Sequence, residues 1–95
     1  MAVRSKKITQ SARGQDCTLR LPGVCNFNSE TTVFAHIGTN RGMGFKCSDV
    51  IGIYACSNCH AEIDGVNRHK LAADKLRALE ETLGILIDSA LVKVA

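Results

Sequence analysis

The chain has 95 residues and a formal net charge of +3. At this length it forms a single domain, and its hydrophobic core is too small to hold the fold without a further restraint. It contains no run of about 18 apolar residues, which excludes a membrane-spanning helix, and its first residues are polar and basic, unlike those of a signal peptide. We therefore expect a cytoplasmic protein with no membrane partner.

The charge is unevenly distributed along the chain. Residues 1–46 have a formal charge of +5, whereas residues 47–95 have a formal charge of −2. A basic half favours a polyanionic partner, and DNA is the partner we predict. A solvated basic surface is the alternative. The candidate DNA-binding residues are Arg13, Arg41 and Lys46.

The N-terminal part of the chain predicts little regular structure. Residues 1–11 are predicted to form a flexible basic arm, and a single domain then occupies residues 12–95. Within that domain, one helical turn could stop at Gly14. The weak alternation of residues 17–20 predicts a short strand, and the Pro22-Gly23 pair predicts a turn after it.

The clearest predicted strand covers residues 31–37, which are rich in β-branched side chains. Alternation places Phe34 and His36 on one face of this strand and Ala35 on the other. The glycine-rich residues 38–47 predict a flexible loop. An apolar run over residues 49–55 then leads to Cys56.

Two helices are predicted in the C-terminal half. The first covers residues 57–64 and ends at Gly65. Leu and Ile side chains recur at a helical spacing over residues 69–92, which predicts a long helix that Asn67 could cap and Gly84 could bend. The apolar stripe of this helix could pack in the core of one chain or form a homodimer.

Four of the five cysteines occur in two pairs. Cys56 and Cys59 form a C-x-x-C motif, which can direct two thiolates toward one metal ion. Cys17 and Cys25 lie on either side of the Pro-Gly turn. In a reducing compartment such pairs are typical of a structural Zn²⁺ site. A redox pair or four buried thiols are the alternatives, and Cys47 has no partner at a ligand spacing.

A candidate active site involves two histidines. His60 and Asp64 share one face of the predicted short helix, so they could bind a second, catalytic divalent metal such as Mg²⁺. If the strand packs beside this helix, His36 and His60 would face a common cleft suited to phosphodiester hydrolysis, with His36 as the base. Alternatively, His36 is a strand residue with one hydrogen bond, and His60 is a zinc ligand or a helix-terminal residue.

The order of these features resembles the HNH, or ββα-metal, nucleases with a zinc-bound treble-clef frame. The resemblance is closest to the small phage and prophage nucleases of the YbcO type. The segments that carry it are ARGQDC at 12–17, LPGVCN at 21–26, ETTVFAHI at 30–37 and ACSNCHAEID at 55–64. It implies a small α+β zinc-bound domain with a treble-clef, ββα-metal HNH-like core and a long C-terminal helix.

The resemblance also implies roles for single residues. His36 matches the general base, and His60 matches a ligand of the catalytic metal. Asp49 falls near the middle position of the motif, where it could orient His36. Many HNH nucleases have an acidic metal ligand just before the first histidine, but this chain has Ala35 there. We expect Asp64 to take the place of that ligand.

The predicted function is a metal-dependent DNA endonuclease that hydrolyses phosphodiester bonds in phage or prophage DNA processing or recombination. The alternative is a non-catalytic zinc module that binds nucleic acid or a protein. The two differ at His36, which only the endonuclease requires.

Overall fold

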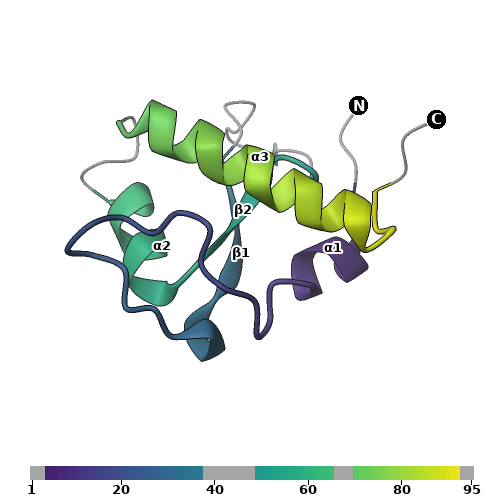
Figure 1. The fold of residues 1–95 in the computed structure, drawn as a ribbon, viewed down its shortest axis with the longest axis horizontal. Helices are drawn as coiled ribbons and strands as arrows, with labels where there is room; N and C mark the ends of the chain where they lie inside the picture. The colour runs from purple at the N-terminus through teal and green to yellow at the C-terminus, as the bar shows by residue number, and fades with distance from the viewer. Residues whose placement is uncertain (1–3, 38–48, 66–69, 93–95) are drawn as a thin grey trace.

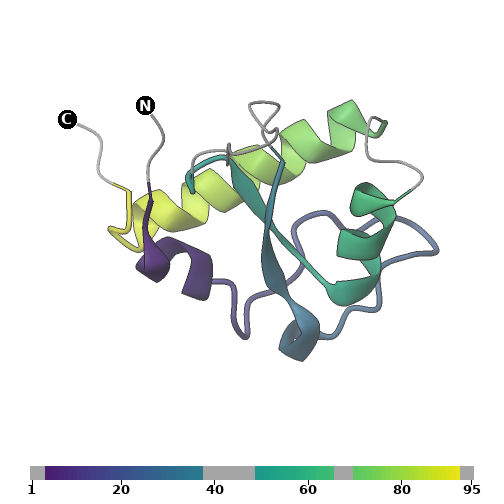
Figure 2. The same ribbon diagram turned by 180° about the vertical axis from the view of Figure 1, so that it is seen from behind.

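The computed structural model describes residues 4–37, 49–65 and 70–92. These form a small α+β domain in which the long C-terminal helix crosses one face of a two-stranded hairpin, as Figure 1 shows. Figure 2, seen from behind, shows the opposite face of the hairpin between the two short helices. In chain order the elements are α1 (Lys6–Gln10), a 3₁₀ helix (Ser29–Thr31), β1 (Val33–His36), β2 (Gly52–Ala55), α2 (Ser57–Asp64) and α3 (Ala72–Asp88).

The hairpin is antiparallel and pairs Phe34 with Tyr54 and His36 with Gly52. β1 lies inside the strand predicted over residues 31–37, whereas Thr31 belongs to the 3₁₀ helix instead. A side chain at Gly52 would collide with the ring of Phe34, so glycine is required where the two strands meet. This register places His36 at the end of β1, close to the chain that enters β2.

The outer edge of β2 is covered by two threonines instead of a third strand. Thr18 donates its backbone N–H to the Tyr54 carbonyl at 2.7 Å and its hydroxyl to the same oxygen at 2.9 Å. The Tyr54 N–H donates to the hydroxyl of Thr82 at 3.3 Å. The strand predicted for residues 17–20 does not form, because Arg20 has a left-handed backbone (φ 43°) that ends any extended pairing after one residue.

Helix α3 lies inside the predicted range and continues through Gly84 without a break. The residue before it, Leu71, has a left-handed backbone, and the predicted cap Asn67 lies outside the described residues. The helix buries one narrow stripe against the hairpin, made of Ala78, Thr82 and Leu86. Leu76 and Ile87 remain exposed, and a homodimer through this helix stays a prediction.

The apolar side chains form two small clusters, and α3 contributes to both. One cluster lies at the cysteine end and includes Leu19, Ile53, Ile63 and Ala78. The other lies at the α1 end and includes Ile8, Ala12, Tyr54 and Leu86. Neither is large, which agrees with the expectation that hydrophobic burial alone is marginal in this chain.

Residues 4–11 do not form the expected flexible arm, because they contain helix α1, while residues 1–3 of that arm lie outside the described residues. The Ser5 hydroxyl caps the helix by accepting the N–H of Ile8, and Ile8 itself is only 3% exposed. Tyr54 reaches the same segment, since its hydroxyl lies 2.7 Å from that of Ser11. A single buried turn has too few apolar residues for its periodicity to be recognised in the sequence. None of the helices in the described ranges is long and apolar enough to cross a bilayer.

Ile8→Ala tests whether α1 belongs to the folded domain. Because Ile8 is buried against the α1-end cluster, we expect a loss of about 2–5 kcal/mol in the free energy of unfolding, measured by urea denaturation. Lys6→Ala, an exposed position on the same helix, is the control and should change stability by less than about 0.5 kcal/mol. Equal stability of the two variants would mean that α1 is not packed.

Candidate metal centre and active site

The structure brings the four predicted cysteines together. Cys17 and Cys25 flank the Pro-Gly turn, where Gly23 takes the left-handed backbone (φ 74°) that the turn requires. Cys56 is the N-cap of α2, and Cys59 lies in the first turn of that helix. All four sulfurs lie within 4.8 Å of one another.

The spacing of the sulfurs fits a tetrahedral metal ion and excludes a disulfide. The sulfurs of Cys25 and Cys56 are 3.8 Å apart, far beyond a bonded pair of about 2.05 Å. Four sulfurs at about 2.3 Å from one ion would be separated by about 3.8 Å. Four cysteines in this arrangement could hold a metal ion such as zinc.

The electrostatics of the cluster also favour a cation. Burial raises the pKa of the Cys56 thiol, but the backbone N–H groups of Cys59 and Asn26 oppose this effect, and the resulting pKa is about 7. Burial and the neighbouring thiols raise the pKa of Cys25 and of Cys59. Thiols this close together therefore cannot all ionise unless a cation binds the resulting thiolates.

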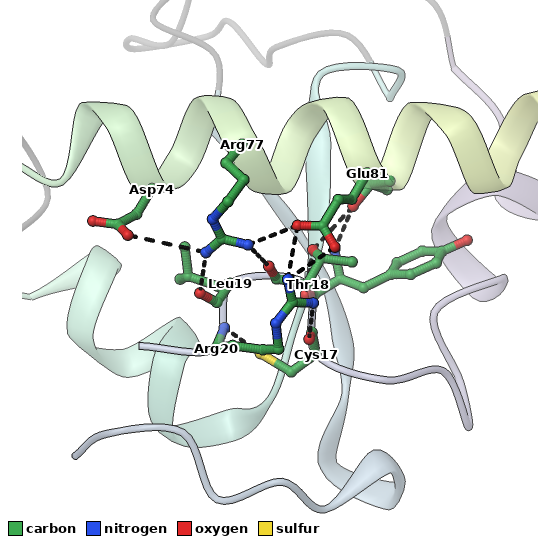
Figure 3. Close-up of polar contacts among 9 residues, drawn as sticks. Cys17, Thr18, Leu19, Arg20, Asp74, Arg77 and Glu81 are labelled. Carbon is green, nitrogen blue, oxygen red and sulfur yellow. Dashed lines mark hydrogen bonds and ion pairs between the residues drawn. The ribbon is translucent and has the colours of Figure 1, made fainter. Parts of the chain in front are cut away.

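A set of polar contacts that was not predicted from the sequence, here called the polar clamp, attaches the loop of Cys17 and Cys25 to α3 (Figure 3). The guanidinium of Arg77 donates to the carbonyls of Thr18 at 2.9 Å and Leu19 at 2.7 Å. It also donates to the Glu81 carboxylate at 2.6 Å. Arg20 approaches the same carboxylate from the loop, with both oxygens at 2.9 Å from one nitrogen.

The clamp also reaches the loop of Cys17 and Cys25 through Arg20. While the Arg20 side chain binds Glu81, its backbone N–H points at the Cys17 sulfur, 3.4 Å away, as Figure 3 shows. The orientation of Cys17 therefore depends on α3 as well as on its own turn. The spacing of Arg77 and Glu81 as an i, i+4 pair could have indicated a contact on the helix, but nothing in the sequence indicates the loop carbonyls.

The predicted pairing of His36 with Asp49 is present. The His36 Nε2 lies 2.7 Å from one oxygen of Asp49, and the backbone N–H of Ser5 donates to the other oxygen at 2.6 Å. Although burial opposes ionisation, the hydrogen bonds from Ser5 and His36 hold the pKa of Asp49 below its usual value. An ionised Asp49 accepts the proton on Nε2, so the neutral His36 ring has its lone pair on Nδ1.

His60 and Asp64 also meet, one turn apart on α2. The His60 Nε2 lies 3.1 Å from an Asp64 oxygen, and both side chains are partly exposed. Two ligands of one octahedral ion at about 2.1 Å each would be separated by about 3 Å, so this spacing permits a shared metal. It is equally the spacing of a simple ion pair on a helix surface.

The remaining predicted site residues are less connected. Arg13 is exposed just after α1, whereas Arg41 and Lys46 lie outside the described residues, as does Cys47. Within the ranges that the structure describes, the four cysteines are the only group of three or more potential ligands close enough to hold one ion. A cleft shared by His36 and His60 stays a prediction.

The chain is similar to several known proteins. A family model described as "Putative nuclease YbcO" matches residues 6–85. Proteins named "Putative nuclease YbcO" from Escherichia coli (strain K12) and "Putative nuclease ybcO" from Enterobacteria phage 82 are each 51% identical over 59 residues. Those matches cover 60% of this chain and 62% of either relative, so the chain spans less than two thirds of their length.

A solved structure is also similar. It is titled as a putative bacteriophage protein from Escherichia coli K-12 MG1655, with a TM-score of 0.66 and 36% sequence identity. The match covers 86% of this chain and 98% of the solved one. Since the family model extends from α1 to the C-terminal part of α3, it includes the four cysteines and both histidine–carboxylate pairs. The chain therefore belongs to the family described as "Putative nuclease YbcO".

Proposed function

We propose that this protein is a metal-dependent DNA endonuclease of the HNH type. The observation that carries the proposal is the buried Asp49 carboxylate, which holds the His36 imidazole at 2.7 Å and is itself held by the Ser5 N–H. A carboxylate-oriented neutral imidazole is the arrangement of a general base. The family description and the basic N-terminal half support the same reaction, which we assign to phage or prophage DNA processing or recombination.

In the proposed reaction, His36 accepts a proton from a water molecule at Nδ1, the ring nitrogen opposite its contact with Asp49. The water oxygen forms a bond to phosphorus, and the bond between phosphorus and the leaving ester oxygen breaks. The products are a phosphate monoester and a hydroxyl, and the leaving oxygen takes up a proton from solvent. Asp49 stays ionised and stabilises the imidazolium that forms.

His60 and Asp64 would hold the catalytic metal, with Asp64 taking the place of the acidic ligand absent at Ala35. When bound, a divalent ion polarises the phosphate and stabilises the leaving oxygen. Two protein ligands suffice for Mg²⁺, which keeps several waters and also binds the phosphate of the substrate.

The four cysteines would bind Zn²⁺ in a structural role. The ion would join the loop of Cys17 and Cys25 to the start of α2, which is the helix that carries His60 and Asp64. This connection is the basis of the proposed treble-clef frame. A small domain that depends on a metal in this way folds only when the metal is bound.

Removal of the metal tests the structural role. We expect the purified protein to contain one zinc per chain by elemental analysis, and chelation to abolish the folded circular dichroism spectrum at 25 °C. Cys56→Ser should lose both the zinc and the cooperative unfolding transition, because one ligand is lost from a closed site. Cys47→Ser is the matched control and should retain both. A protein that stays folded after complete chelation would exclude this role.

Cleavage of DNA tests the general base. Wild-type protein is incubated with supercoiled, single-stranded and branched DNA in magnesium or manganese. We expect His36→Ala to reduce cleavage by at least about 100-fold, because the proton acceptor is lost. Asp49→Asn should cause a smaller loss, and Glu30→Gln, an exposed acid in the 3₁₀ helix, should cause none.

Absence of cleavage by the wild-type protein in every condition would exclude the endonuclease. Salt-sensitive DNA binding that survives His36→Ala, with no cleavage, would instead identify the non-catalytic zinc module.

The proposed catalytic metal gives a separate test at α2. We expect His60→Ala and Asp64→Ala each to raise the magnesium or manganese concentration needed for half-maximal cleavage by about tenfold or more, since each removes one ligand. Glu62→Gln on the same helix should leave that concentration unchanged. If Asp64→Ala cleaves with the wild-type metal dependence, Asp64 is not a ligand.

A further inference from the structure

Arg4 lies beside the His36–Asp49 pair. Its guanidinium approaches an Asp49 oxygen at 3.8 Å, and the same oxygen is 2.7 Å from the Nε2 of His36. The next residue, Ser5, donates its backbone N–H to the second Asp49 oxygen. One buried carboxylate therefore places a guanidinium and the proposed general base next to each other.

This position of Arg4 is set by the fold. Ser5 is the N-cap of α1, and the helix is held down by Ile8, which packs in the α1-end cluster. Ser5 is fixed by its hydrogen bond to Asp49 and by its cap of α1, and the neighbouring Arg4 therefore lies beside the His36–Asp49 pair.

The Arg4–Asp49 contact is weak as a stabilising interaction. At 3.8 Å it is longer than a hydrogen bond, and the Arg4 side chain is 47% exposed whereas that of Asp49 is 12% exposed. Ion pairs with an exposed partner contribute little to stability. A guanidinium has five donors in a fork that matches phosphate oxygens, so a partly exposed guanidinium beside the proposed general base suits a phosphate group of the substrate.

The surroundings of Arg4 favour an anion. Residues 4–15 include no acidic side chain but four basic ones, which are Arg4, Lys6, Lys7 and Arg13. All four are exposed. Exposed cations on and beside α1 would attract a phosphodiester backbone to this part of the domain.

We propose that Arg4 binds the phosphate of the DNA backbone at the His36–Asp49 site. The proposal rests on the proposed function for the identity of the reacting group, and it adds the residue that holds that group. Asp49 then has two side-chain partners, since it orients His36 by a hydrogen bond and keeps Arg4 beside it. A phosphate bound by Arg4 would lie within reach of the water that His36 deprotonates.

Binding without cleavage gives the first test. The probe is a fluorescent DNA duplex, and its anisotropy is measured over a range of salt concentrations without added magnesium or manganese. We expect Arg4→Ala to weaken binding by about tenfold at low salt and to reduce the slope of log Kd against log salt by about one, because one phosphate contact is lost. Arg4→Lys should keep the salt slope, since it keeps the charge.

The matched control is Lys70→Ala. Lys70 is exposed just before α3, whereas α1 packs near Leu86 at the opposite end of that helix, as Figure 1 shows. This variant loses the same charge far from His36 and should change the salt slope by much less than Arg4→Ala. Equal effects of the two variants, or an Arg4→Ala slope identical to that of the wild type, would overturn the proposal.

The rate of DNA cleavage tests whether Arg4 acts on the phosphate or only affects Asp49. We expect Arg4→Ala and Arg4→Gln to cleave at least about tenfold more slowly than the wild type at saturating DNA, with Arg4→Lys intermediate because lysine lacks the fork. Their thermal unfolding should match that of the wild type.

Full activity of Arg4→Ala alongside loss of activity in His36→Ala would support the endonuclease and reject the proposed role of Arg4. A reduced salt slope for Arg4→Ala, with no cleavage by the wild-type protein, would support the phosphate contact and reject the endonuclease.

Discussion

The convergence of four cysteine sulfurs is the constraint on which the rest of the structure depends. The two apolar clusters are small, and the hairpin has only two strands, an arrangement that is marginal by itself. The cysteines join the turn around Gly23 to the start of α2, and Leu21 near this turn and Ile63 of this helix both belong to the cysteine-end cluster. Thiols this close together favour a bound cation, because a positive charge removes the cost of ionising buried neighbours.

Polar contacts then connect this centre to the remainder of the fold. Thr18 and Thr82 satisfy the backbone of β2 where a third strand would otherwise be needed, and Arg77 binds the carbonyls next to Cys17. Helix α3 is therefore attached to the cysteine loop by hydrogen bonds and to the hairpin by a narrow apolar stripe. Buried carbonyls without such partners would be costly, so the clamp determines where the loop lies.

The His36–Asp49 pair of the candidate active site is positioned by the hairpin and by the N-terminal segment. The hairpin register places His36 beside the chain that leads into β2, and the backbone N–H of Ser5 in the N-terminal segment donates to Asp49. His36 and His60 thus each have a carboxylate partner, His36 from a distant segment and His60 from the same helix. The first pair is partly buried, which suits the proposed base, whereas the second is more exposed and suits an ion that retains water.

The sequence by itself determined the features that depend on short-range spacing. The C-x-x-C motif at the start of α2, the end of that helix at Gly65, the strand leading to His36 and the long C-terminal helix all follow from local patterns, and the structure contains them. Only the tertiary structure decided the contacts between distant segments. These are the packing of α1 in one apolar cluster with Leu86 of α3, the hydrogen bonds from Arg77 to the backbone of the cysteine loop, and the contacts of Ser5 and Arg4 with Asp49. The physical reason is that backbone carbonyls and N–H groups are the partners in these contacts. Every residue carries those groups, so no residue pattern marks which of them a distant side chain will bind.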